Sequence, residues 1–375
     1  MTLSISPSPW RSTLIARLRW ALFPLGLWIV TRLSYLLLGY LSLKLTPGLR
    51  GSASPPLRPY PSLDALCCWD CGWYDRLARV GFRNAYEANF WPGLPFAARY
   101  VSKLTGVSAG LAVLMVANLA CLGAYVTIYR LFLRLDGQRV ARAALVLYAA
   151  YPFAYYHASG YPETIMIFAS ALAISLAMAG RHAWAGIVLG LGIMSRHLTV
   201  LLGAGLLAAQ LRQRGPRRFF ASPSFLALGL PFVIVGMYLV YCHFHWGDAL
   251  AFWNGRNSWG KTAWWNIVDV IRHYKSRPHI VSFIPFALIP AIGALGLLRS
   301  PKYAELAAAV LPLSAVLWII GAFALGRYSA SCWPAFLPLG KWYERHPRWQ
   351  VPLLLFFGLA QGWYFFLHSH HYEIQ

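Results

Sequence analysis

The composition of this chain excludes an ordinary soluble protein. Of its 375 residues, 58% are hydrophobic and only 12% are charged, and the mean hydropathy is +0.51. The formal net charge of +22 would indicate nucleic-acid binding in a soluble protein, but the basic residues here stand in short loops between apolar segments, as topology signals do. We therefore expect membrane lipids, and no nucleic acid, around this protein.

Apolar segments recur along the whole chain. A run of about 20 apolar residues crosses a bilayer as a helix, and about ten or eleven candidates are present, some of them too short to span alone: 20–43, 107–131, 141–156, 162–180, 183–195, 198–211, 222–243, 279–298, 304–325, 330–340 and 350–367. The sequence predicts an all-α polytopic membrane protein, with residues 1–375 forming a single multi-pass domain.

Four basic clusters predict the topology. They lie within residues 11–19, 130–142, 212–218 and 341–348, and such clusters favour the cytoplasmic side. This places the N-terminus inside and two long loops outside, 44–106 and 244–278, together with the tail after Leu367. The first apolar stretch continues to Leu43 without a small-residue cleavage site, so we interpret it as an uncleaved helix. Within the first outer loop, residues 64–83 predict a short amphipathic helix at the membrane surface, with Trp73, Leu77 and Val80 on one side.

Two segments are too short for the number of membrane crossings that the flanking basic residues require. Residues 183–211 lie between Arg181 and the cluster at 212–218, both assigned to the cytoplasm, yet they are too few to cross twice. Two half-spanning helices hinged near Ser195-Arg196-His197 resolve the conflict and bury Arg196, which then needs a cavity or a charged partner. Segment 304–340 poses the same problem, with Gly326-Arg327-Tyr328 at its turn.

Five polar constellations are candidates for chemistry: Asp70 with Asp75, Tyr161-Pro162-Glu163, Ser195-Arg196-His197, Gly247-Asp248, and Gly326-Arg327-Tyr328. A carboxylate can deprotonate a hydroxyl, and arginine can hold a phosphate through two parallel hydrogen bonds. Cationic groups also stabilise a departing phosphate. Together these residue types fit the transfer of a group from a phosphate-linked donor to a hydroxyl.

Each candidate also has a structural explanation. Asp75 stands four residues before Arg79, so an ion pair on one helix face is the favoured interpretation. Glu163 is explained equally well by the preference of carboxylates for a helix N-terminus. Structural pairing would also account for Arg196 and Arg327, although their positions in the middle of segments favour function. Nothing in the local helix pattern requires an acid at Asp70, which is therefore the first candidate.

Other reactive side chains give weaker signals. Cys67, Cys68 and Cys71 lack the second pair typical of a zinc site, and we expect a packed loop in which a disulfide is an open alternative. The tail His368-Ser369-His370-His371 is interpreted as an exposed, incidental cluster, so no metal site is assigned. Most of the 17 tryptophans are accounted for by an aromatic belt at the membrane surface.

The order of the motifs resembles a known family. Trp69-Asp70-x-x-Trp73-Tyr74, Ala78-x-x-Gly81-Phe82 and Phe90-Trp91-Pro92-x-x-Pro95 resemble the first luminal loop of the PIG-V-like mannosyltransferases, which are GT-C glycosyltransferases. The other elements of the resemblance follow in family order: Pro152 with Tyr161-x-Glu163, Ser195-Arg196, Gly247-Asp248-Ala249-Leu250-Ala251-Phe252 with Trp259-Gly260, and Arg327-Tyr328. Two departures, Phe-Trp-Pro-Gly-Leu-Pro at 90–95 and His197 in place of a small polar residue, concern the acceptor more than the fold.

The resemblance implies a GT-C bundle and an inverting transfer of mannose, or of another hexose or pentose, from a polyprenyl-phosphate donor to a hydroxyl on the outer face. It implies no cofactor, nucleotide sugar or essential metal, and Asp70 as the base. The implied donor contacts are Arg196, His197, Arg327, Tyr328, Glu163 and Tyr161. The implied sugar and acceptor contacts are Trp69, Trp73, Tyr74, Asp248 and Trp91.

Several alternatives stay open at this stage. The acceptor is a lipid, a glycan or a protein. The Ala/Leu/Arg-rich composition indicates a bacterial inner membrane, with the ER membrane as the alternative. A transporter or flippase of lipid-linked sugars is the competing function, because broken helices and buried arginines occur there too. The outer loop with its Trp-Asp motif favours the enzyme, and a non-catalytic scaffold would leave Asp70, Glu163 and Arg196 unexplained.

Overall fold

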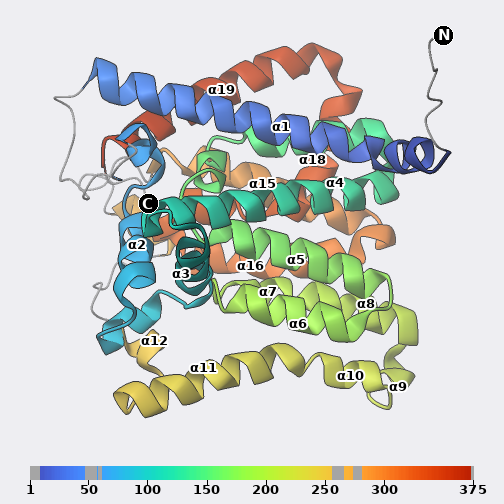
Figure 1. Ribbon diagram of the computed structural model, residues 1–375. Coiled ribbons are helices and arrows are strands. Elements are labelled where there is room, and N and C mark those ends of the chain that lie inside the picture. The colour runs from blue at the N-terminus through green and yellow to red at the C-terminus, as the bar shows by residue number, and fades with distance from the viewer. Residues whose placement is uncertain (1–8, 47–56, 58–60, 256–265, 273–280, 373–375) are drawn as a thin grey trace, which may run out of the picture.

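The computed structural model describes residues 9–46, 57, 61–255, 266–272 and 281–372. The secondary structure of these residues is helical, and none of them forms a strand (Figure 1). Five stretches are long and apolar enough to cross a membrane: Arg19–Leu45, Ala109–Ala150, Pro223–Trp246, Pro301–Ile319 and Pro347–Ser369. Shorter apolar helices span Glu163–Met178, His182–Ile193 and Ile284–Arg299. The predicted all-α, multi-pass membrane architecture is confirmed.

The longer helices follow the predicted segments closely. They are α1 (Pro9–Leu45), α4 (Ala109–Ala150), α5 (Glu163–Met178), α6 (His182–Ile193), α8 (Ala204–Arg214), α11 (Leu230–Trp246), α15 (Ile284–Gly296), α16 (Ala304–Ile319), α18 (Phe336–Arg345) and α19 (Pro347–Ser369). Helix α4 is two helices in one range, because Gly137 has φ 80° and ψ 177°. Only glycine adopts this conformation readily, so the chain turns there between the two segments expected at 107–131 and 141–156.

Short elements connect these helices or cover one end of the bundle. The α-helical ones are α2 (Asp70–Val80), α3 (Gly93–Thr105), α7 (Thr199–Leu202), α9 (Pro216–Phe219), α10 (Pro223–Ala227), α12 (Ala251–Asn254), α13 (Ile267–Arg272) and α17 (Leu325–Ser329). The 3₁₀ turns are η2 (Pro61–Leu66), η3 (Ala85–Asn89), η4 (Ala154–His157), η7 (Leu297–Arg299), η8 (Pro301–Tyr303), η9 (Ala322–Ala324) and η10 (Trp333–Ala335).

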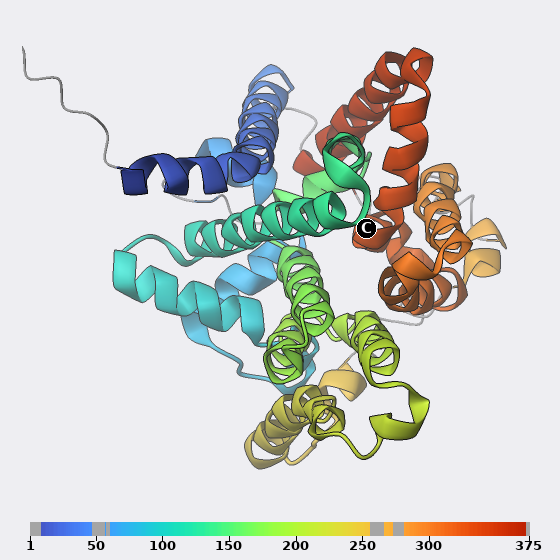
Figure 2. The same cartoon turned by 90° about the vertical axis from the view of Figure 1, so that its right-hand side faces the viewer.

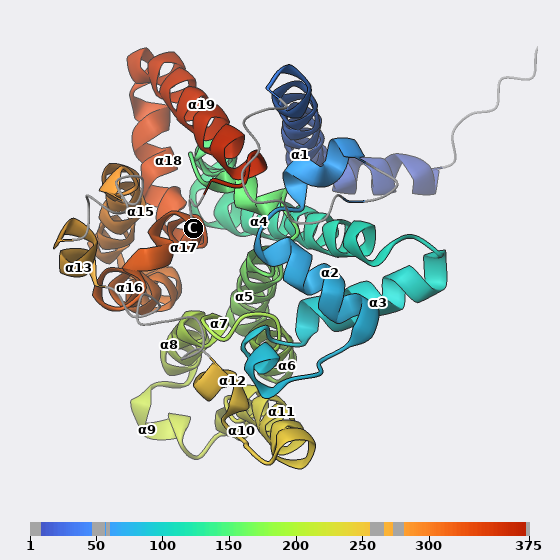
Figure 3. The same cartoon turned by 90° about the vertical axis from the view of Figure 1, so that its left-hand side faces the viewer.

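One end of the bundle carries the elements of both predicted outer loops. Helices α1, α4, α5 and α11 run roughly parallel, whereas α2 lies across their ends (Figure 1). Viewed from that end, α2 and α3 lie side by side in front of the bundle (Figure 3). The chain terminus reaches the same end, since Ser42 Oγ lies 3.0 Å from Ser369 Oγ and Thr46 Oγ1 lies 2.8 Å from His370 Nε2.

The opposite end of the bundle faces the viewer in Figure 2. Asp136, beside the turn of α4, accepts hydrogen bonds from Lys302 Nζ and Tyr303 OH, both at 2.6 Å. Arg212 pairs there with Glu305 at 3.1 Å. The separation of the basic clusters from residues 61–105 therefore agrees with the topology predicted from charge. Which end faces the cytoplasm stays a prediction.

The turns expected in both segments are confirmed, and the two helices around the first turn are short, as expected. Helix α6 ends at Ile193, the chain turns through Ser195-Arg196-His197, and α7 and α8 return from Thr199. Because α6 and α8 contain 12 and 11 residues, neither crosses a bilayer alone. Between α16 and α18 the chain likewise turns through α17, which carries Arg327.

The helix expected over residues 64–83 is wrong at both ends. Residues 61–66 form η2, and α2 begins only at Asp70, because Trp69 has φ 55° and ψ −119° and cannot continue a helix. The helix ends at Val80, followed by Gly81 with φ 80°. Val80 is also 39% exposed, so it does not share the buried side of Leu77.

Candidate functional site

Asp70 is held at the start of α2 by contacts on each side of it. Cys67 and Cys71 form a disulfide that brackets it, which answers the question that the sequence left open. Tyr161 OH donates to the carbonyl of Cys68 at 3.3 Å. Trp69, the residue before Asp70, adopts a positive φ that is rare for a bulky side chain. Strained residues of this kind cluster at functional sites, so the local backbone supports a role for Asp70.

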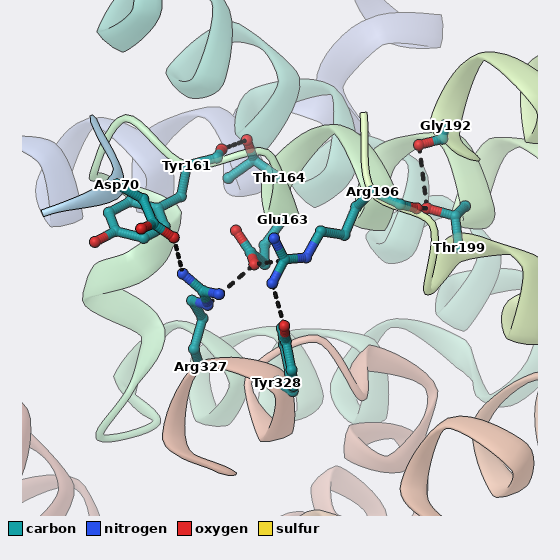
Figure 4. Close-up of polar contacts among 9 residues, drawn as sticks. All are labelled: Asp70, Tyr161, Glu163, Thr164, Gly192, Arg196, Thr199, Arg327 and Tyr328. Atoms are coloured by element: carbon teal, nitrogen blue, oxygen red, sulfur yellow. Dashed lines mark hydrogen bonds and ion pairs between the residues drawn. The ribbon is translucent and has the colours of Figure 1, made fainter. Parts of the chain in front are cut away.

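Four charged side chains from four elements meet in one chain of ion pairs (Figure 4). Arg327 Nη1 donates to Asp70 Oδ2 at 2.6 Å. Arg327 Nε lies 3.2 Å from Glu163 Oε1, and Arg196 Nε lies 3.3 Å from the same oxygen. Arg196 Nη2 also donates to Tyr328 OH. The structure thus brings together the predicted base and four of the six predicted donor residues.

The four side chains of the cluster differ in solvent exposure, and their formal charges sum to zero. The exposed fraction of the side chain rises from 1% at Glu163 to 6% at Arg327, 11% at Arg196 and 17% at Asp70. Two carboxylates balance two guanidinium groups, as buried charges require. Glu163 lies deepest, where a single carboxylate holds both arginines together. Asp70 stands at the open side.

The cluster keeps unused hydrogen-bonding capacity. Among the residues that the structure describes, both carboxylate oxygens of Glu163 and the Nε atoms of Arg196 and Arg327 make no hydrogen bond, although they lie at ion-pair distance. Buried polar groups normally find partners, so this geometry is suited to a ligand that supplies them. A guanidinium with free N–H groups matches the paired oxygens of a phosphate.

Aromatic rings fix the two arginines in place. Arg196 Cζ lies 4.9 Å from the centre of the Tyr328 ring, and Arg327 Cζ lies 5.2 Å from the same ring. Arg327 also lies 5.3 Å from the ring of Tyr161. Such cation–π contacts are worth about 0.5–2 kcal/mol each. Tyr161 and Tyr328, both predicted donor residues, therefore position the cations.

Glu163 satisfies both explanations that the sequence left open. It is the first residue of α5, where the helix dipole favours a carboxylate, and it is also the shared partner of the two arginines. Asp75, in contrast, pairs with Arg79 at 3.1 Å one helical turn away. The prediction of a local ion pair for Asp75 is confirmed.

Two of the predicted sugar contacts, Trp73 and Tyr74, lie on α2, and Trp69 directly precedes it. Tyr74, one turn further along the helix, is 1% exposed, and burial raises its pKa above the ordinary value although the nearby charge of Arg196 opposes the shift. Its hydroxyl therefore stays protonated at neutral pH. The ring centre of Trp69 lies 6.0 Å from that of His371. Trp73 stacks on Phe90 at 5.3 Å.

Trp91 and His197 meet in a second, mainly packed group. The Trp91 ring lies 6.1 Å from His197, 5.1 Å from Tyr238 and 5.0 Å from Phe252. Trp91 is only 3% exposed, so in this structure its ring packs against protein. The contact with Phe252 joins the first outer loop to the second. The predicted sugar contact of Trp91 and donor contact of His197 stay predictions.

Asp248 shapes its own loop. Its two carboxylate oxygens accept hydrogen bonds from Leu250 N and Asn254 Nδ2, both at 2.8 Å, which orders the turn before α12. Trp259 and Gly260, from the same predicted motif, lie outside the described residues. A sugar contact for Asp248 likewise stays a prediction.

Gly93 is a residue whose role the sequence alone did not reveal. Its N–H donates to Met194 O at 2.7 Å, so the first outer loop rests on the turn that carries Arg196. A Cβ at Gly93 would contact Ser195 Oγ and would lie 2.9 Å from Met194 O. The available signal was the departure at residues 90–95, where this glycine stands.

The histidine tail is the clearest correction. The sequence predicted exposure, but His368 and His370 are 0% exposed and His371 is 6% exposed. The ring of His368 lies 5.2 Å from Tyr155 and 6.0 Å from Tyr161. The tail folds back against aromatic residues beside the site, which hydropathy alone could not show. Within the described ranges, no group of three or more His, Cys, Asp or Glu residues is placed to hold a metal ion.

Comparisons with known proteins agree with this architecture. Residues 91–245 match the family model described as dolichyl-phosphate-mannose-protein mannosyltransferase. No curated protein matches the chain in sequence.

Solved structures are similar in fold. ArnT from Cupriavidus metallidurans bound to undecaprenyl phosphate has a TM-score of 0.57 and 14% identity, over 89% of this chain and 63% of that chain. The apo state of ArnT from Cupriavidus metallidurans has a TM-score of 0.52 and 14% identity, over 88% of this chain and 62% of that chain. The oligosaccharyltransferase of Archaeoglobus fulgidus tethered with an acceptor peptide has a TM-score of 0.46 and 14% identity, over 92% of this chain and 55% of that chain. The chain spans less than two thirds of the length of these proteins, and the likeness to ArnT shows a GT-C type fold.

Proposed function

We propose that this protein is a membrane glycosyltransferase that moves a sugar from a polyprenyl-phosphate donor to a hydroxyl acceptor, with inversion at the anomeric carbon. The observation that carries this proposal is the chain Asp70–Arg327–Glu163–Arg196, which sets a carboxylate at the open side of two buried guanidinium groups. The family model over residues 91–245 and the likeness to a protein seen with undecaprenyl phosphate support it.

The two arginines form the donor end of the proposed site. A phosphate diester carries one negative charge before transfer, and the released polyprenyl phosphate carries two. Guanidinium groups bind such oxygens through paired, charge-assisted hydrogen bonds. Arg196 and Arg327 are already desolvated and fixed against Tyr328, so they can stabilise the growing charge without first being reorganised.

Asp70 is the base in this proposal. It takes the proton of the acceptor hydroxyl, the oxygen attacks the anomeric carbon, and the bond from that carbon to the phosphate oxygen breaks. Asp70 becomes neutral while the leaving phosphate gains one negative charge, so the total charge of the site is unchanged. Because the total charge stays the same, no additional charge has to be buried beside Glu163, which is itself fully buried.

Donor binding would also free Asp70 from its hydrogen bond with Arg327. Without donor, Arg327 donates to Asp70 at 2.6 Å, so this carboxylate is bound to a guanidinium and not to an acceptor hydroxyl. A phosphate that pairs with Arg327 competes for that hydrogen bond and leaves Asp70 to the acceptor. Glu163, the deeper partner, keeps both arginines in position during the exchange.

The finer assignments belong to the proposal as well. The sugar is mannose, with another hexose or a pentose as the alternative, and the acceptor is a lipid, glycan or protein. The two guanidinium groups supply the positive charge that the leaving group needs, so the transfer requires no nucleotide sugar and no essential metal. We place the site on the outer face of a bacterial inner membrane, with the ER membrane as the alternative.

The test compares products in cells and then with purified protein. Mass spectrometry of glycolipids and glycoproteins from a deletion strain should show loss of one glycosylated product, which wild type restores and Asp70→Asn does not at equal protein level. Purified protein in nanodiscs should then consume polyprenyl-phosphate mannose when that acceptor is added. Movement of the intact donor across vesicle membranes, without its consumption, would instead establish the transporter.

A further inference from the structure

A cavity lies beside α2, and none of the four charged residues of the cluster lines it. It has a volume of about 850 Å³, is open on one side, and is lined mainly by residues of α2, α3 and the start of α4. Asp75 and Arg79 line it from α2, whereas Asp70, on the same helix, contacts Arg327. Asp75 and Arg79 lie one turn apart and share one face of α2, and Asp70 does not line the cavity.

The charge of this cavity favours an anion. Three basic side chains and a single acidic one line it, the basic ones being Arg79, Arg99 and Lys103. Arg99 is anchored, since its Nε donates to Ala78 O at 2.8 Å and its Nη2 donates to Arg79 O at 3.3 Å. A guanidinium carries five N–H donors, so Arg99 retains donors for a ligand after these two contacts.

The N-terminus of α4 adds to the positive charge around the cavity. Ser108, the N-cap of α4, and Ala109, its first residue, both line the cavity. The N-terminal end of a helix carries partial positive charge and unpaired N–H groups, which suit a phosphate. The terminus of α4 and the three basic side chains thus line one cavity.

An exposed apolar stripe on α3 adjoins this cavity. Phe96, Tyr100 and Leu104 repeat at intervals of four residues along α3 and are 40%, 65% and 85% exposed. Such an apolar stripe on a short helix, with cations beside it, is typical of a helix that lies in the interface between headgroups and acyl chains. Arg99 and Lys103 each precede a residue of this stripe by one position, and cations beside such a stripe attract anionic lipids.

We propose that this cavity binds the phosphate-bearing headgroup of an anionic phospholipid. The phosphate would bind Arg99, Lys103 and the N-terminus of α4, while Leu57 and Ala109, which also line the cavity, contact the apolar part of the lipid. The site is distinct from the proposed sugar-transfer site, and the lipid remains chemically unchanged there. Its existence does not depend on the proposed glycosyltransferase activity.

The test uses protein reconstituted in nanodiscs that contain phosphatidylcholine and phosphatidylglycerol. Native mass spectrometry should show that wild type retains phosphatidylglycerol in preference to phosphatidylcholine. Lys103→Gln should lower this preference about fivefold, the effect of about 1 kcal/mol for one cation near a lipid surface. Lys103 is exposed at the last turn of α3, so the variant should keep the thermal unfolding midpoint of wild type.

Two further variants sharpen the result. Arg99→Gln should lower the preference further, but it also removes the contacts to α2, so its unfolding midpoint is measured in parallel. Lys44→Gln removes an exposed cation at the same end of the bundle but outside the cavity, and it should leave the preference at the wild-type value. A preference that is absent in wild type, or equal in Lys103→Gln and wild type, would overturn the proposal.

A final experiment distinguishes a lipid ligand from a soluble anion. Inorganic phosphate is titrated onto wild type in nanodiscs of pure phosphatidylcholine, and the unfolding midpoint is followed. Stabilisation by phosphate that Lys103→Gln abolishes, without any preference for phosphatidylglycerol, would overturn the lipid assignment in favour of a soluble phosphate compound. A preference for phosphatidylglycerol that phosphate weakens supports recognition of the lipid phosphate itself.

Discussion

Arg327 donates a hydrogen bond to Asp70 across 2.6 Å, although the two residues are 257 positions apart in the chain. The same guanidinium lies 3.2 Å from Glu163. One arginine therefore joins the carboxylate at the open side of the site to the one buried beneath it. An anion that binds Arg327 Nη1 competes with Asp70 for this hydrogen bond, and the first three predictions test this chain of ion pairs.

The first prediction concerns the base. Asp70→Asn preserves the shape of the side chain and removes its basicity, so we expect turnover to fall by about 10²-fold or more. Donor binding, measured by native mass spectrometry, should persist because both arginines remain. Asp75→Asn on the same helix should lower turnover far less, since an exposed i,i+4 pair contributes about 0.3–0.5 kcal/mol. An Asp70→Asn protein with wild-type turnover would remove Asp70 from the mechanism.

The second prediction concerns the donor phosphate. Arg196→Ala should weaken donor binding by about 1.5–3 kcal/mol, the value of one charge-assisted hydrogen bond. Arg196→Lys should recover little, because an ammonium cannot reproduce the paired geometry of a guanidinium. Arg212→Ala serves as the control, since Arg212 also pairs with a buried glutamate, Glu305, at the other end of the bundle. Donor affinity that falls equally in the Arg196 and Arg212 variants would contradict the assignment.

The third prediction concerns the shared carboxylate. Glu163→Gln leaves two neighbouring buried arginines without their common partner, which should lower the free energy of unfolding by about 3–5 kcal/mol. Added donor brings negative charge back, so the shift of the unfolding midpoint caused by donor should be larger in Glu163→Gln than in wild type. Glu305→Gln should lower stability without changing the donor-induced shift. An equal shift in all three proteins would show that the phosphate binds elsewhere.

The fourth prediction concerns the contact between the first outer loop and the Arg196 turn. Gly93→Ala places a Cβ 2.9 Å from Met194 O, which displaces the turn and with it Arg196. We expect kcat with the lipid-linked donor to fall while the protein still folds. Gly236→Ala in α11 is the matched control, because a Cβ there meets nothing within 4 Å. That variant should be neutral or more stable by about 0.5–1 kcal/mol, and the prediction fails if both variants behave alike.

The fifth prediction concerns topology. Thr105→Cys at the end of α3 and Arg214→Cys at the end of α8 introduce exposed thiols at opposite ends of the bundle. A reagent that does not cross membranes should label the first from outside and the second only after permeabilisation. The native thiols should stay silent, because Cys67 and Cys71 form a disulfide and Cys68, Cys121, Cys242 and Cys332 are buried. Labelling of both introduced cysteines from one side would refute the orientation.

Much of the architecture could be predicted from local properties of the sequence. Hydropathy located the membrane helices, because the cost of placing a residue in hydrocarbon depends mainly on that residue. The half-spanning helices followed from a conflict between segment length and the sidedness of basic clusters. The Asp75–Arg79 pair followed from helical spacing. These features need no knowledge of which helices are neighbours.

Other features depend on neighbours and escaped prediction. The helix expected over 64–83 begins only at Asp70, because the backbone of Trp69 is held in a conformation that interrupts it. The tail from His368 to His371 is buried, since it packs beside Tyr155 and Tyr161 rather than facing water. Neither outcome follows from the polarity of the residues concerned.

The sequence by itself determined which residues carry charge inside an apolar chain, and hence that Asp70, Glu163, Arg196 and Arg327 required partners. The tertiary structure decided that they are partners of one another. Membrane helices such as α5 and α6 are apolar nearly all round, so no amphipathic pattern specifies which side of one helix faces the next. Side-by-side packing therefore set the pairing, and it placed one carboxylate beneath both arginines and the other at the open side.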